Sequence, residues 1–464
     1  MKEKKFTYHW VIVLACFLMM AASIGIVINC FNVFTVELMA EFGWDAGDVQ
    51  LIGTIVSLAA LIGGAVVGKV MARFTMRRAI PVYAVVTAAG FFLYRFCHSL
   101  PAFYVVSLVV GLGMSGVSLI PCGALINNWF SEKKGTATGI AFTGSVAGGM
   151  ILVQVTQAVV DASGWRMGYT VLGVISAVVL IPTALFLVRE SPRDKGLLPL
   201  GVKPGDSAAA APLTGISAGR FLKTGSFWLL ALSMFIIGFI NMGIQNNFSI
   251  YMQDELGHSE SFSTNIFTLV MGIQIVGKVL LGAIYDKKGV KFGTAYCTLL
   301  FLLAAGCSLA AGNTAAAVAF GALFGLVCSM TTVSPPYLTM LVAGRRNYSV
   351  IYGLLSLFYG VGVAVGPVVA AKVFDSGGSY APAWIAFMVL SLVMAAATVA
   401  GVRRSAEYST ASTETMLFLS LPLSPQKSKS RQHCCRDLLC FSFSLYSLSS
   451  IQRRSQGFGP VFDA

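Results

Sequence analysis

Long apolar segments separated by short polar ones run along most of this chain. A helix needs roughly 20 mostly apolar residues to cross a bilayer. The pattern predicts twelve such spans, at residues 9–36, 49–72, 79–97, 101–126, 136–160, 166–188, 226–252, 262–285, 292–312, 314–343, 350–373 and 379–402. We therefore expect an all-α membrane protein with twelve transmembrane helices.

Glycine and proline positions of the first six spans recur in the last six at a constant offset of 214 residues. The matched pairs include Gly63 and Gly277, Gly68 and Gly282, Gly111 and Gly325, Pro121 and Pro335, Gly139 and Gly353, and Gly164 and Gly378. Duplicated membrane halves are typical of secondary transporters, which bind their substrate between the repeats near the middle of the membrane. We expect pseudo-symmetric six-helix halves at 1–188 and 226–402, a cytoplasmic linker at 189–225, and a disordered cytoplasmic tail at 403–464.

Composition and charge agree with a membrane protein. Of the 464 residues, 56% are hydrophobic and only 11% are charged, whereas a soluble protein has about 25% charged residues. The net charge of +13 could suggest nucleic-acid binding, but 27 of the 32 Lys and Arg residues fall on one side if the spans alternate from a cytoplasmic N-terminus. This positive-inside distribution predicts a multi-pass plasma (bacterial inner) membrane protein with both termini in the cytoplasm, and no nucleic-acid partner.

A ten-residue loop after the eighth span resembles a signature of the major facilitator superfamily. The segment from Gly282 to Lys291, GAIYDKKGVK, resembles the family's G-x-x-x-D-[RK]-x-G-x-[RK] loop. Its repeat at 68–77 has Ala72 in place of the acid and Thr75 in place of the glycine. The resemblance implies the major facilitator fold and a latch that holds the cytoplasmic side closed. The residues it assigns to that latch are Gly68, Arg73, Arg77, Gly282, Asp286, Lys287, Gly289 and Lys291.

Further motifs resemble the oxalate–formate antiporter and monocarboxylate transporter branch of that superfamily. They are Asn128-Trp129-Phe130, the segment 133–139, Gly164-Trp165-Arg166 and Gly277-Lys278. The resemblance implies that the cation at 278 binds a substrate carboxylate. Oxalate carriers also have a Lys followed by Gly in span eleven, where this chain has Tyr359-Gly360, so a dicarboxylate such as oxalate is not favoured.

The residues themselves also single out Lys278. It lies eight residues before Asp286, roughly 12 Å along the helix, and a cation at that depth costs several kcal/mol unless it faces a cavity or a partner. No Asp or Glu lies in the middle of any span, so we expect the substrate to be its counterion, although a water-solvated structural Lys is the alternative. Further polar side chains in the spans are Gln274, Asn29, Asn32, Asn246, Tyr352, Ser356 and Tyr359. Each either binds substrate or joins helices.

The sequence thus favours a monomeric carrier of a small organic anion, a monocarboxylate, working by antiport or proton-coupled symport. No cofactor is expected: the spans show no nucleophile–base or metal-ligand spacing, and no G-x4-G-K-[ST] loop for ATP occurs. One alternative is a carrier of neutral or amphiphilic compounds, including an efflux protein. Another is a transporter-like sensor that signals through the tail.

Overall fold

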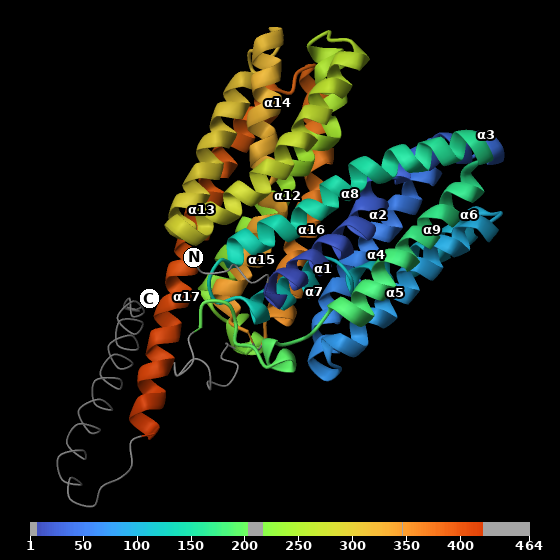
Figure 1. Ribbon diagram of the computed structural model, residues 1–464. Helices are drawn as coiled ribbons and strands as arrows, with labels where there is room; N and C mark the ends of the chain where they lie inside the picture. Colours follow the sequence, from blue (N-terminus) through green and yellow to red (C-terminus); the bar gives the residue numbers. More distant parts are fainter. Residues whose placement is uncertain (1–6, 203–216, 346, 421–464) are drawn as a thin grey trace, which may run out of the picture. The chain divides into compact units, whose positions relative to one another are not determined.

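The computed structural model describes residues 7–202, 217–345 and 347–420, and within these residues the chain is almost entirely helical (Figure 1). In these described segments, eleven helices are long and apolar enough to cross a membrane. The longest, Glu260–Ser308, contains a break at Gly289, whose φ of 77° lies in the left-handed region that favours glycine. That helix therefore supplies the eighth and ninth spans, and the predicted all-α membrane fold is confirmed.

The first six spans and the segment after them comprise elements from α1 to α11. They are α1 (Tyr8–Ala22), α2 (Ile24–Asn29), α3 (Phe31–Phe42), α4 (Ala46–Arg73), α5 (Met76–Leu93), η1 (Tyr94–Phe96), α6 (Leu100–Ser115), α7 (Leu119–Trp129), α8 (Lys134–Ser163), α9 (Trp165–Pro182), η2 (Thr183–Leu187), η3 (Pro192–Lys195) and α11 (Ala218–Phe221).

The last six spans comprise α12 to α17. They are α12 (Gly225–Ile250), η4 (Tyr251–Glu255), α13 (Glu260–Ser308), α14 (Thr314–Cys328), α15 (Met330–Ala343), α16 (Tyr348–Gly377) and α17 (Ala381–Ser420). Residues up to Ala406 belong to one compact unit. Most of the tail predicted at 403–464 lies outside the described residues.

The fourth and tenth spans are each interrupted at the same point of the repeat. The fourth breaks between α6, which ends at Ser115, and α7, and the tenth breaks at Ser329 between α14 and α15. Pro335 and Pro336 follow the second break, and proline removes a helical hydrogen bond. Cys328 stands at this break, so its backbone carbonyl is available to other helices.

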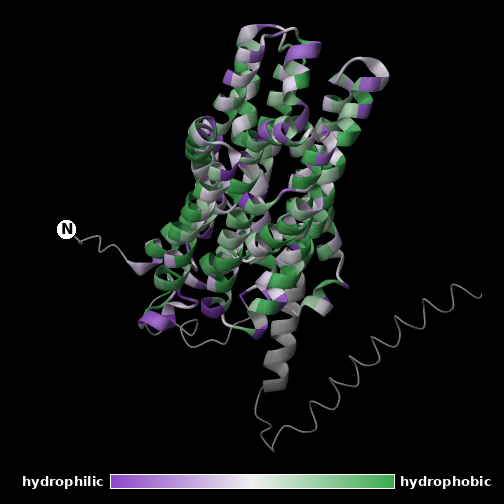
Figure 2. Cartoon of the chain, turned by 90° about the vertical axis from the view of Figure 1, so that its right-hand side faces the viewer, coloured by the Kyte–Doolittle hydropathy of each residue, from purple (hydrophilic) through white to green (hydrophobic). Residues whose placement is uncertain are grey.

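One apolar cluster is centred in each half, with Met340, Tyr348 and Tyr352 of the second half joining the first cluster. Many large apolar side chains on the outer faces of the helices remain exposed. Figure 2 shows hydrophobic residues along the helices and hydrophilic ones mainly toward the helix ends and loops. In water such an exposed apolar surface would be unfavourable. It is the surface that lipid covers.

The two halves meet along two seams related by the repeat. In one, Gly135 of α8 packs on Gly282 of α13, and in the other Gly68 of α4 packs on Ser349 of α16. A methyl group at any of these glycines would overlap backbone of the opposite half. Residue 135 matches 349 and residue 68 matches 282 at the offset of 214, so the two contacts are equivalent.

The hydrogen bonds between the halves lie toward one end of the bundle. This end, called the basic end below, is formed by the segments 73–76, 130–134, 286–291 and 344–345, with Arg73, Lys133, Lys134, Lys287 and Arg345. Within the described chain, every hydrogen bond between the halves lies between this end and the level of Lys278. Figure 1 shows α8 and α13 diverging away from it. The structure is therefore closed at the basic end.

Candidate functional site

Lys278 of α13 lies at the seam between the two halves and is fully buried, with 0% of its surface exposed. Its ammonium donates hydrogen bonds to the Phe142 carbonyl oxygen, at 3.0 Å, and to the Ser145 hydroxyl, at 2.9 Å, both on α8. Neither partner is charged. An ion pair joins Arg166 to Glu41, at 2.7 Å, and no acidic side chain of the described residues pairs with Lys278. The charge of Lys278 therefore has no carboxylate counterion in this part of the chain.

Cys328 organises the polar groups beside Lys278. Its carbonyl oxygen accepts a hydrogen bond of 3.1 Å from the Gln274 amide, and its thiol sulfur accepts bonds of 3.4 Å from the amides of Asn241 and Gln245. It also lies close enough to Lys278 to interact electrostatically. Gln274, one turn from Lys278 on α13, is thereby held in place beside the cation.

The expected polar stripe of α16 is divided between two environments. The Tyr359 hydroxyl interacts with the Thr331 side chain and lies close to Cys328. Ser356 faces Gly64 across the α4–α16 seam, and Tyr352 is buried beside Tyr348 with ring centroids 5.6 Å apart. The structure thus brings Tyr359 together with Gln274 and Lys278 around Cys328, whereas Ser356 lies at the second seam and Tyr352 lies near Cys122 of α7.

The asparagines lie apart from this cluster. Asn29 donates a 3.2 Å hydrogen bond to the Gly25 carbonyl and packs against Gly149 of α8. Asn32 and Asn246, which match at the repeat offset, both have exposed side chains. In the described residues the structure gives neither of them a contact with the Cys328 cluster.

Asp286 joins the halves at the basic end. Its carboxylate accepts hydrogen bonds from the backbone N–H of Gly135, at 2.7 Å, and from the N–H and hydroxyl of Thr136, at 2.6 and 2.7 Å. These are unpaired donors of the first turn of α8, where the helix dipole also favours a negative charge. Asp286 is thus the N-terminal cap of a helix in the other half.

The remaining residues of the expected latch divide into packing and surface positions. Gly68 and Gly282 are the close-approach glycines of the two seams, and Gly289 makes the turn inside α13. The basic members have exposed side chains in this conformation; they are Arg73, Arg77, Lys287 and Lys291.

Sequence reasoning missed a further contact between the halves at the basic end. The Arg345 guanidinium donates to the Ser131 hydroxyl at 2.6 Å and to the Asn127 carbonyl at 3.2 Å, and the Asn127 amide donates to the Gly344 carbonyl at 3.0 Å. Partial burial lowers the pKa of Arg345 from its usual value. Positions 131 and 345 match at the repeat offset, and this match is the sequence feature that could have indicated the contact.

The segment after η2 is attached to the first half. The Trp129 indole donates to the Arg189 carbonyl at 2.8 Å, and Leu200 pairs with Phe130 and bonds to Ser131 and Glu132. Glu190 accepts a bond from the backbone of Met76 at the start of α5, and burial raises the pKa of its carboxyl. The segment therefore supports the loop that precedes α8.

The family model described as Major Facilitator Superfamily matches residues 11–291 and 230–452, which together cover most of the chain. Monocarboxylate transporter 12 of Xenopus laevis is 24% identical over 396 residues, covering 82% of this chain and 85% of that protein. Monocarboxylate transporter 4 of Rattus norvegicus is 25% identical over 383 residues, covering 80% and 78% respectively.

Solved structures share the fold at lower identity. FucP, crystallised in the outward conformation, has a TM-score of 0.65 and 14% identity, covering 85% of this chain and 99% of its own. The proton:xylose symporter XylE has a TM-score of 0.62 and 15% identity, covering 84% and 94%. With its apolar helices, its two repeated halves and these matches, the chain belongs to the Major Facilitator Superfamily, a family of multi-pass membrane carriers that are not enzymes.

Proposed function

We propose that this protein carries a small organic anion, a monocarboxylate, across the membrane. The observation that supports this most directly is the environment of Lys278. The cation is fully buried between the halves, and its two hydrogen-bond partners are the neutral Phe142 carbonyl and Ser145 hydroxyl. A buried ammonium without a carboxylate partner is unfavourable, and an anionic substrate would remove that cost.

The similarity to proteins named monocarboxylate transporters supports the same class of substrate. In the proposed site the carboxylate takes the place of the Phe142 and Ser145 oxygens on the Lys278 ammonium. Gln274 and Tyr359, both next to Cys328, orient the substrate. We assign the contacts that the substrate makes later along the pathway to Asn29, Asn32, Asn246, Tyr352 and Ser356.

Transport then requires that the basic end, closed in this structure, opens. The contacts that must break are those of Asp286 with the start of α8 and those of Arg345 with Ser131. We place the basic end in the cytoplasm, in agreement with the positive-inside rule, with the halves at 1–188 and 226–402 and both termini on that side. Because no carboxylate side chain stands near Lys278, we infer that a co-transported proton would travel with the substrate.

The test is uptake of radiolabelled carboxylates into proteoliposomes that contain the full chain. Lys278→Gln removes the charge but keeps a polar side chain of similar length. Lys372→Gln is the matched control, because it removes a cation from an exposed position of α16. We expect Lys278→Gln to abolish uptake of every transported carboxylate and Lys372→Gln to retain it.

The same vesicles distinguish the coupling modes and the competing function. Uptake that requires an internal anion indicates exchange, and uptake driven by a pH gradient indicates symport with a proton. Full carboxylate transport by correctly inserted Lys278→Gln protein would refute the proposed role of Lys278. Competition by lipophilic cations, without competition by carboxylates, would instead support a carrier of amphiphilic compounds.

A further inference from the structure

The hydrogen bonds that Lys278 makes are those that an uncharged amine can make. A lysine ammonium has three N–H groups and a full charge, whereas the amine has two N–H groups and a lone pair. The Phe142 carbonyl accepts one N–H, at 3.0 Å, and the Ser145 hydroxyl, at 2.9 Å, can either accept the second or donate to the lone pair. These two neutral partners satisfy the amine in its fully buried position.

The helices around Lys278 supply no opposite charge. Within the described chain, α12 contains no titratable side chain, and the charged side chains of α8 are Lys134 and Asp161, near its two ends. The titratable groups in the surroundings of Lys278 are the Cys328 thiol and, close to it, the Tyr359 phenol. A thiol and a phenol are both mostly uncharged at neutral pH, so neither is a counterion for an ammonium.

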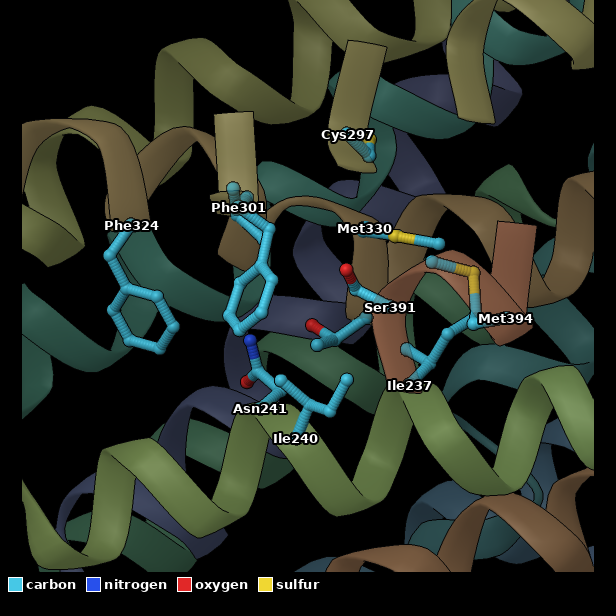
Figure 3. A pocket seen from close by; sticks show the side chains of 11 residues that line it. Ile237, Ile240, Asn241, Cys297, Phe301, Phe324, Met330, Ser391 and Met394 are labelled. Atoms are coloured by element: carbon cyan, nitrogen blue, oxygen red, sulfur yellow. The ribbon is translucent and has the colours of Figure 1, made fainter. Parts of the chain in front are cut away.

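The interior of the second half beside this site is also uncharged. Figure 3 shows a cavity next to Asn241, whose amide donates to Cys328; its volume is about 30 Å³ and none of its lining residues is charged. Asp286, the nearest acid along α13, is eight residues from Lys278 and bonds to the start of α8. Burial without a counterion disfavours the charged form of a lysine.

We propose that Lys278 carries the coupling proton: it is an amine in the closed, empty protein and an ammonium when the carboxylate is bound. This inference rests on the proposed function, because it requires an anionic substrate at Lys278. When the site opens to water, the amine takes up a proton, since an ammonium in water keeps its proton up to about pH 10. The carboxylate then binds the ammonium, and the site closes around a pair with no net charge. The proton crosses beside the substrate, on the lysine.

The return of the empty protein completes the cycle. After the carboxylate leaves, closure would bury an ammonium against the neutral Phe142 carbonyl and Ser145 hydroxyl, which is unfavourable. Lys278 therefore releases its proton to water on the side where the anion is released, and the empty protein closes as the amine. Net transport thus moves a proton with each carboxylate. Exchange of one carboxylate for another needs no deprotonation, because the site is occupied in both directions.

The test is uptake of radiolabelled pyruvate by the full chain in proteoliposomes, measured in two modes. Net uptake starts with vesicles that contain no carboxylate and are alkaline inside, and exchange starts with pyruvate on both sides at equal pH. Lys278→Arg supplies a guanidinium, which keeps its proton in proteins and binds carboxylates. Lys372→Arg, at an exposed position of α16, is the matched control.

We expect the wild-type protein and Lys372→Arg to support both modes. Lys278→Arg should support exchange with an altered KM, but its net uptake should fall at least about a hundredfold, because arginine is uncharged at least about a hundredfold less often than lysine. Net uptake by Lys278→Arg that a pH gradient still drives would overturn the inference, as would wild-type transport that always requires internal carboxylate. If the wild-type protein transports no carboxylate in either mode, the proposed function itself is wrong.

Trifluoroacetate tests the same point in the wild-type protein, so the result stands even if Lys278→Arg fails to fold. Its carboxylate takes up a proton only in strong acid, so this substrate cannot carry the coupling proton itself. With Lys278 as the proton carrier, a pH gradient should drive net uptake of trifluoroacetate. If the gradient drives uptake of pyruvate but not of trifluoroacetate, the proton travels on the substrate and the inference is wrong.

Discussion

Asp286 offers the sharpest test of the closed basic end, because its hydrogen bonds join the two halves across the seam. It accepts three bonds, two of them from backbone N–H groups at the start of α8. Asp286→Asn removes the charge and turns an NH2 group toward one of those donors. A charged hydrogen bond contributes about 1.5–3 kcal/mol and a favourable helix-dipole interaction up to about 2. We therefore expect the closed form to lose about 2 kcal/mol relative to the open one.

A change of about 2 kcal/mol alters the ratio of the two forms by roughly 30-fold. The ratio is measurable as a distance distribution between spin labels on cysteines placed at Gly47 and Gly312, in a background without native cysteines. Both positions lie at the end opposite the basic end, one in each half, and a side chain at either meets no atom within 4 Å. Asp286→Asn should shift the distribution toward shorter distances, as that end closes while the basic end opens.

The control is Asp254→Asn, which removes an exposed carboxylate at the opposite end. It should leave the distribution as in the wild-type protein. If Asp286→Asn also leaves the distribution unchanged, or if both variants shift it equally, the cap on α8 does not hold the basic end closed and the latch interpretation is wrong.

Three further outcomes follow from the structure. Ser145→Ala removes one of the groups that compete with substrate for Lys278, so the KM for a transported carboxylate should fall by about fivefold, corresponding to about 1 kcal/mol; an unchanged or higher KM would contradict this. Gly282→Ala introduces a methyl group that overlaps backbone across the seam, whereas Gly272→Ala on the same helix meets open space; only the first should shift the spin-label distances. Burial raises the pKa of Glu190, so the ionised carboxylate destabilises the fold once the pH rises past its usual pKa. Glu190→Gln should therefore raise Tm at neutral pH, and the gain should disappear in acid; a gain that is independent of pH would refute this.

The fold could be predicted from sequence because the bilayer imposes one simple requirement. Each span must satisfy its own backbone hydrogen bonds and present apolar side chains to lipid. In the helix over 260–308 the loop motif and the apolar pattern agree, because both place a break between the spans expected at 262–285 and 292–312. The structure assigns it as one helix, but Gly289, expected in the loop, provides the turn between two spans.

The candidate site was only partly visible in the sequence. Lys278 stands out because a buried cation is rare. One of its partners, however, is the Phe142 carbonyl, and a sequence does not show which backbone carbonyl accepts a hydrogen bond. Cys328 was not among the expected site residues, although its carbonyl and thiol hold three amide side chains. Ser145 did carry a signal, since it matches Tyr359 at the repeat offset.

The two seams differ in charge although the repeat relates their backbones. Lys278 and Asp286 lie eight residues apart on α13 and both bond to α8, whereas their counterparts on α4 are Gly64 and Ala72. The group proposed to bind the anion and the group that caps α8 therefore act on the same pair of helices. When a carboxylate replaces Ser145 as the partner of Lys278, α8 loses a bond to α13 on the same face that Asp286 holds. The α4–α16 seam has no charged pair at the equivalent positions, so it can remain in contact while the charged seam separates. We infer that substrate binding and opening of the basic end are coupled along α8 and α13.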